Sequence, residues 1–146
     1  MIGILRTRFD RSNVLYLDLV AALGADQLGS RLADLPSDTI GHQLWCVLGA
    51  RESYPRAARA GSWQGFSSPV TNDQVTDASS LRSALESTHA EVTAWVDGLA
   101  EDDEGGITYA LALLEHETQH HGQLIRYLYG LGIPCPDSWR SQYALD

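Results

Sequence analysis

Apolar residues recur at steps of three and four along four stretches of the chain. This period places apolar side chains on one face of a helix, where neighbouring helices can bury them. Tyr16, Leu19 and Leu23 in the first stretch follow this spacing. The four predicted helices cover about Leu5–Leu23, Ser37–Gly61, Thr76–Leu99 and Ile107–Tyr129.

Residues that start and stop helices mark the ends of these stretches. The segment Ser37–Thr39 supplies side chains that cap the N-terminus of the second helix. Pro55 lacks a backbone N–H, so it is expected to end or kink that helix, with any last turn finishing at Gly61. Gly24 ends the first helix, and Gly130 and Gly132 end the fourth.

A loop rich in Gly, Ser, Pro and Asn is predicted between Gly61 and Val75. Trp63 and Phe66 are the side chains expected to anchor it to the helices. A loop of this length in a compact domain is often functional, for instance as a lid.

The four amphipathic helices predict the fold class. No strand alternation and no internal repeat interrupts them, and each helix must bury its apolar stripe against the others. The prediction is an all-α four-helix bundle that forms a single domain over residues 1–146.

The charge of the chain limits its partners. The formal net charge is −9, whereas a nucleic-acid-binding protein needs a basic face. An anionic membrane surface is disfavoured for the same reason. We therefore expect a small-molecule substrate, with no nucleic acid and no membrane partner.

Several features favour the cytoplasm. No apolar run approaches the roughly 20 residues of a membrane span. The apolar start of the chain is too short for a signal peptide. In the cytoplasm Cys46 and Cys135 are expected to stay reduced rather than form a bridge.

Three of the five histidines fall within six residues of the fourth predicted helix. His116 and His120 are four residues apart, so they lie one turn apart on one face. Two imidazoles at this spacing can hold one metal ion. His121 points about 100° away from His120 and is a poorer partner.

The segment from His116 to His120 also matches the His-Glu-x-x-His pattern of zinc proteases. A protease is disfavoured because no strand is predicted that could bind a peptide. Glu117 lies near the middle of the apolar arc and needs a partner if it is buried. It is a candidate to orient a histidine ligand or to form a salt bridge.

A metal ion needs a third protein ligand, and the second helix offers His42 and Cys46, four residues apart. Cys46 with the two histidines would form a Cys-His-His set with an open fourth position. From the residues alone, the simpler interpretation is that Cys46 is a small buried hydrophobe and His42 lies near solvent.

For the remaining polar and aromatic residues, a structural role is the simplest interpretation. His89 lies on the apolar stripe of the third helix and is a candidate for proton transfer, although such histidines are more often satisfied core residues. The four tryptophans are most simply packing residues. Arg51 and Glu52 are expected to be solvated or ion-paired.

The chain resembles the DinB-like family, whose last helix carries His-x-x-x-His-x-Gly-Gln. His116, His120, Gly122 and Gln123 stand in that register, and this motif is fairly specific. The segment Thr39–Cys46 resembles the family's second helix, so the likeness covers nearly the whole chain.

One residue departs from the family pattern. The family's histidine ligand on the second helix aligns with Cys46 rather than with His42. Either Cys46 replaces that ligand, or His42 reaches in from one turn earlier, or the third ligand is lost. Both side chains are chemically competent ligands.

The resemblance implies a bundle with long crossover connections and a divalent metal ion, zinc or nickel, with open positions for substrate. It also implies a homodimer. Some members resemble transferases that attach a low-molecular-weight thiol, such as bacillithiol or mycothiol, to electrophiles, so such a thiol is an expected cosubstrate.

Two classes of function follow. The first is a metal-dependent enzyme in which His116, His120 and Cys46 or His42 hold the metal. Glu117 or His121 would orient a ligand and His89 would move a proton. The alternative is a metal-poor bundle that binds a small molecule, or a structural homodimer without catalysis.

Overall fold

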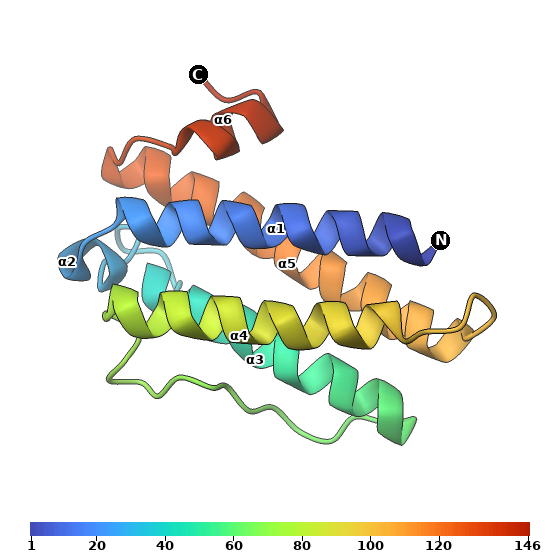
Figure 1. The fold of residues 1–146 in the computed structure, drawn as a ribbon. Coiled ribbons are helices and arrows are strands. Elements are labelled where there is room, and N and C mark those ends of the chain that lie inside the picture. The colour runs from blue at the N-terminus through green and yellow to red at the C-terminus, as the bar shows by residue number, and fades with distance from the viewer.

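The computed structural model describes residues 1–146, and its regular secondary structure consists of helices without strands (Figure 1). Four long helices carry most of the chain, and two short ones follow the first and the last of them. The helices are α1 (Ile2–Ala22), α2 (Ala25–Leu28), α3 (Ile40–Ala60), α4 (Ala78–Asp97), α5 (Glu104–Leu131) and α6 (Asp137–Tyr143).

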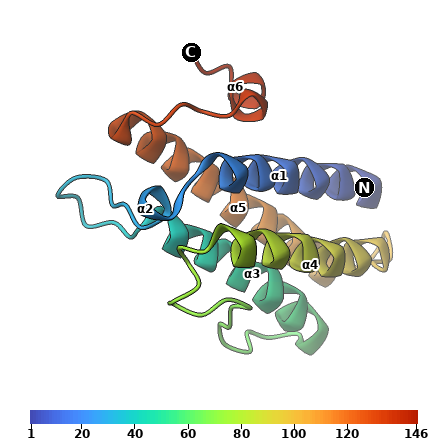
Figure 2. The same ribbon diagram turned by 60° about the vertical axis from the view of Figure 1, so that its left-hand side comes forward.

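The four long helices pack against one another in a closed order. Helix α1 packs mainly on α4, α4 on α3, α3 on α5, and α5 on α1. Helices α1 and α5 run in one direction and α3 and α4 in the other (Figures 1 and 2). Because α3 and α4 are parallel neighbours, the segment 61–77 must return the length of α3 before α4 begins. None of the helices combines the length and the apolarity needed to cross a lipid bilayer.

Most predicted helix ends agree with the structure. The Thr39 side chain caps α3 by accepting a hydrogen bond from the backbone N–H of His42 at 3.1 Å. The backbone of Gly61 is left-handed, with φ of 69°, and it terminates α3 as expected. Gly132 ends α5 in the same way, with φ of 66°.

Pro55 was expected to end or kink α3, and it does not end the helix. The helix continues through Pro55 to Ala60, and Pro55 itself is buried. Proline removes one backbone hydrogen bond from a helix. Ser53 and Ala57, two residues to either side of Pro55, are buried, and their packing holds the helix together across it.

Two apolar clusters fill the interior, and a polar layer lies between them along every long helix. On α1, Leu5 and Phe9 belong to one cluster and the apolar residues from Leu15 onward to the other. Ser12 and Asn13, also buried, lie between the two sets. The residues of the polar layer on the other helices are Arg51 of α3, Thr88 of α4, and Glu117 and His121 of α5.

A buried ion pair forms the centre of this layer. Arg51 Nε donates to Glu117 Oε1 at 2.7 Å, and the two side chains are 1% and 0% exposed. Arg51 Nη1 also donates to Asn13 Oδ1 at 2.8 Å and to the carbonyl of Leu85 at 3.3 Å. One guanidinium on α3 therefore bonds to α1, α4 and α5.

Removing the Arg51 guanidinium should strongly destabilise the fold. Arg51→Ala leaves the Glu117 carboxylate buried without a counter-charge, which costs about 3–5 kcal/mol of unfolding free energy. Urea unfolding followed by circular dichroism measures the change. The matched control is Arg82→Ala, which breaks the exposed Arg82–Glu86 pair and should cost less than about 1 kcal/mol. Equal losses in the two variants would contradict this account.

Candidate metal centre

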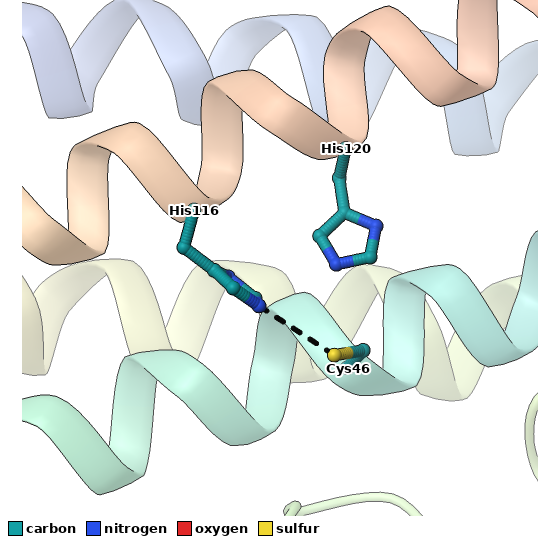
Figure 3. A group of neighbouring side chains, drawn as sticks. All are labelled: Cys46, His116 and His120. Carbon is teal, nitrogen blue, oxygen red and sulfur yellow. Dashed lines mark hydrogen bonds between the residues drawn. The ribbon is translucent and has the colours of Figure 1, made fainter.

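Three potential metal ligands from two helices meet at one point. Cys46 extends from α3, and His116 and His120 extend from successive turns of α5 (Figure 3). One ligand atom from each residue lies within 4.8 Å of the other two. Helices α3 and α5 pack on each other at this level, so their contact brings Cys46 to the two histidines.

One pair of donors has the separation that a zinc site needs. Cys46 Sγ lies 3.6 Å from His116 Nε2. Zinc bonds of about 2.3 Å to sulfur and about 2.0–2.1 Å to nitrogen, at a tetrahedral angle, separate the two donors by about 3.6 Å. The ligand atoms of all three residues lie within 4.8 Å of one another, so His120 is close enough to serve as the third ligand of a tetrahedral ion.

The two histidines differ in how they are held. His120 Nδ1 lies 3.1 Å from the amide oxygen of Gln43, and an oxygen acceptor requires a proton on Nδ1. This contact leaves the lone pair of His120 on Nε2, as it does for metal-ligating histidines. His116 Nδ1 is buried and has no hydrogen-bond partner, so no contact fixes the tautomer of His116.

The protonation of the histidines favours metal binding. Burial lowers the pKa of His116, and burial together with the neighbouring His116 lowers the pKa of His120 to about 4. Both imidazoles are therefore neutral at pH 7 and can donate a lone pair. Burial raises the pKa of Cys46, so its thiol would release a proton on binding a metal ion.

The contact between Cys46 and His116 could instead suggest a cysteine nucleophile with a histidine base. Such a dyad needs a stabilised thiolate and a third group that orients the histidine. Here the pKa of Cys46 is raised, and His116 Nδ1 has no partner. The arrangement therefore suits a metal ion better than a thiolate nucleophile.

His42, the other predicted third ligand, lies outside this group. Its Nδ1 lies 3.0 Å from Thr39 Oγ1, and its Nε2 lies 3.3 Å from Asn72 Oδ1. Both ring nitrogens thus contact residues at the start of α3 and in the 61–77 loop. Of the two candidates on α3, only Cys46 reaches the histidine pair.

The three predicted catalytic residues lie away from the ligand group. Glu117 pairs with Arg51, which agrees with the salt-bridge alternative, and no hydrogen bond joins it to a ligand histidine. His121 Nε2 lies 3.3 Å from Ser12 Oγ, on the side of α5 that faces α1. His89 Nε2 contacts Asp10 Oδ1 at 3.0 Å, between α4 and α1.

A cavity of about 430 Å³ opens beside the ligand group. Cys46 and His120 form part of its wall, so a small molecule inside it would touch the metal centre. The residues that line the cavity are Pro36, Ser37, Asp38, His42, Gln43, Trp45, Cys46, His120, Gln123 and Tyr127.

The 61–77 loop lies against α3 and reaches the surroundings of the cavity. The ring of Phe66 packs on Trp45, with centroids 4.7 Å apart, and rests on the backbone of Gly49. Trp63 packs edge-on against Tyr54. The two side chains predicted to anchor the loop thus contact α3.

Sequence reasoning missed part of the environment of the centre. It did not assign roles to Gln43, which holds His120, or to Asn13, which binds Arg51. It left open whether Arg51 is solvated, but Arg51 is buried. A signal was available, because Arg51 continues the apolar stripe of Leu44 and Leu48 on α3. A charge in such a position requires a partner.

Comparisons with known proteins add no relative. No family model and no curated protein matches the chain. The resemblance to the DinB-like family remains an interpretation of the motif residues His116, His120, Gly122 and Gln123.

The metal-free protein should lose stability in mild acid. The pKa of His120 and that of His121 are each lowered to about 4, mainly by burial, whereas an unfolded chain has a histidine pKa of about 6.5. Above about pH 6.5 both states are neutral at these residues. Below it, the unfolded chain binds protons that the folded chain does not, so the free energy of unfolding falls.

Urea unfolding in a chelating buffer, from about pH 7.5 to about pH 5.5, measures this loss. This range lies above the window in which Glu117 matters, because an unfolded glutamate titrates near pH 4.3. The double variant His120→Gln/His121→Gln should show a weaker pH dependence than the wild type. A wild-type stability that stays constant over the range would contradict the prediction.

Proposed function

We propose that this chain is a metal-dependent enzyme of the DinB-like type, in which Cys46, His116 and His120 hold a divalent ion. It transfers a low-molecular-weight thiol to an electrophilic small molecule. The observation that carries the proposal is the meeting of these three donors beside a cavity of about 430 Å³. The thiol chemistry comes from the family resemblance, and the metal centre from the geometry.

The donor set favours zinc. One thiolate and two imidazoles suit zinc, and three protein ligands leave a fourth position for substrate. Nickel is the second candidate. Gln43 fixes the Nδ1–H tautomer of His120, and the packing of α3 on α5 holds Cys46 close to His116. This arrangement is set before an ion arrives, which favours binding.

The fold supports the same proposal. The four long helices pack in a closed order, with two parallel pairs and a long return segment at 61–77. A four-helix bundle with long crossover connections has these features. The DinB-like topology is part of the proposal.

The cavity has the size and the lining for a small organic substrate. Trp45 and Tyr127 supply aromatic surface, and Gln43 and Gln123 supply amide groups. The hydroxyl of Tyr127 donates to the carbonyl of Asp38. This contact holds one wall of the cavity in place.

The proposed reaction joins the sulfur of the thiol to a carbon of the electrophile. The carbon–sulfur bond forms as the bond to the leaving group breaks, and the thiol proton and the leaving group pass to solvent. A bound divalent ion would lower the pKa of the thiol, so that thiolate is present at neutral pH. The walls of the cavity would hold the electrophile next to the sulfur and exclude water.

Metal content tests the centre directly. Tag-free protein should contain about one zinc or nickel ion per chain, and the loss of one ligand should weaken binding by about tenfold or more. The variants Cys46→Ala, His116→Ala and His120→Ala remove the three proposed ligands. His42→Ala and His89→Ala are matched controls and should keep the ion. Elemental analysis and competition with a chelator measure both quantities.

The outcomes separate the alternatives. If His42→Ala loses the ion and Cys46→Ala keeps it, the third ligand is His42 and the assignment is wrong. If the wild type binds neither zinc nor nickel, the enzyme proposal fails. A metal-poor binding or structural bundle would then remain.

Activity provides a second test. With a cysteine-derived thiol and an activated haloarene, the wild type should speed thioether formation, and His116→Ala should lose this activity. Arg82→Ala, on the exposed face of α4, should keep it. Thiol consumption and halide release should be equal. A fully active His116→Ala variant would contradict a role for the metal centre.

A further inference from the structure

A second cavity, of about 180 Å³, lies between α1, α5 and α6. It faces another side of α5 from the metal centre, because His121 in its wall points about 100° away from His120. The polar residues that line it include Arg8, Arg11, Thr118, His121, Gln142 and Tyr143.

Two arginines give this cavity a positive charge in a strongly acidic chain. Arg8 and Arg11 are three residues apart on α1, so they lie on one face. Neither forms an ion pair, although their neighbour Arg6 pairs with Asp10 and Asp97. No carboxylate lines the cavity. With a net charge of −9, a pair of arginines without acidic partners is an unusual concentration of charge.

A chain of hydrogen bonds fixes which groups in the wall can still donate. Glu117 is ionised opposite Arg51 and can only accept, so Ser12 donates its hydroxyl proton to Glu117. Ser12 Oγ must then accept from Nε2–H of His121, at 3.3 Å. In the neutral imidazole, Nδ1 accepts from the hydroxyl of Tyr143, at 2.7 Å.

The direction of these hydrogen bonds leaves both acceptors and donors free in the wall of the cavity. The hydroxyl of Tyr143 donates its hydrogen bond to His121, so its oxygen can accept one from a ligand. Thr118 donates to the carbonyl of Leu114 and also keeps an oxygen free to accept. The free donors are on three side chains that make no hydrogen bond within the protein, those of Arg8, Arg11 and Gln142.

We propose that this cavity binds a small oxyanion that also carries a hydroxyl group, such as a monohydrogen phosphate. The guanidinium groups of Arg8 and Arg11 bind the charged oxygens, as arginines commonly do for phosphate. The hydroxyl of the ligand donates to Tyr143. The site does not depend on the metal centre.

Titration calorimetry with inorganic phosphate at neutral pH and low salt tests the site. We expect one saturable site per chain, weakened at least about tenfold in the double variant Arg8→Gln/Arg11→Gln. The matched control is Arg59→Gln/Arg82→Gln, which removes the same charge elsewhere and should change the affinity by less than about twofold. All four arginines are exposed or lie near the surface, so the variants should fold.

Sulfate tests the role of the hydroxyl. At neutral pH sulfate carries the charge of the ligand without a proton to donate. Phosphate should therefore bind more tightly than sulfate in the wild type, and Tyr143→Phe should remove this preference. A preference that survives in Tyr143→Phe would overturn the assignment of the hydroxyl to Tyr143.

The metal centre must be excluded as the binding site. Cys46→Ser should bind phosphate as tightly as the wild type does. Loss of binding in Cys46→Ser would place the anion at the metal centre and overturn the proposal. An absence of saturable binding up to tens of millimolar, or an equal loss in the two arginine double variants, would also overturn it.

Discussion

The buried ion pair between Arg51 and Glu117 is the contact on which the arrangement of the long helices depends. Arg51 bonds to Glu117 on α5, to Asn13 on α1 and to the carbonyl of Leu85 on α4. A buried charge tolerates little displacement from its partner. The pair therefore fixes how far α3 can slide or rotate against the other helices, a restriction that two apolar clusters alone would not impose.

This restriction extends to the metal centre. Glu117 follows His116 directly, and Arg51 lies little more than one turn after Cys46 on α3. The ion pair therefore limits how far α3 can slide along α5 in the region where Cys46 contacts His116. The polar layer thus restricts the position of the three candidate ligands, although it contributes none of them.

The position of Glu117 also explains why the zinc-protease pattern misleads. In those enzymes the glutamate of His-Glu-x-x-His acts as general base beside the metal. Here Glu117 is held by Arg51 and Ser12 within the core. Its side chain is fully buried and does not line the cavity, so the sequence pattern alone does not define the chemistry.

Much of the fold follows from periodicity and capping, and those features were visible in the sequence. Helical period predicted the four long helices, and Thr39 and Gly61 marked the ends of α3. The pair His116 and His120 could be predicted because i and i+4 residues share a face. The choice between Cys46 and His42 could not, because it depends on how α3 is rotated against α5. The passage of α3 through Pro55 depends on tertiary packing in the same way.

Two glycines of α3, Gly41 and Gly49, leave space that residues of the 61–77 loop occupy. A β-carbon on Gly49 would collide with the ring of Phe66, and one on Gly41 would collide with the carbonyl of Val75. Alanine is intrinsically better than glycine in a helix, by about 1 kcal/mol. At these two positions, however, it would push the 61–77 loop away from α3. Strengthening the helix and keeping the loop attached are therefore opposing demands on the same residues, and this chain favours attachment of the loop.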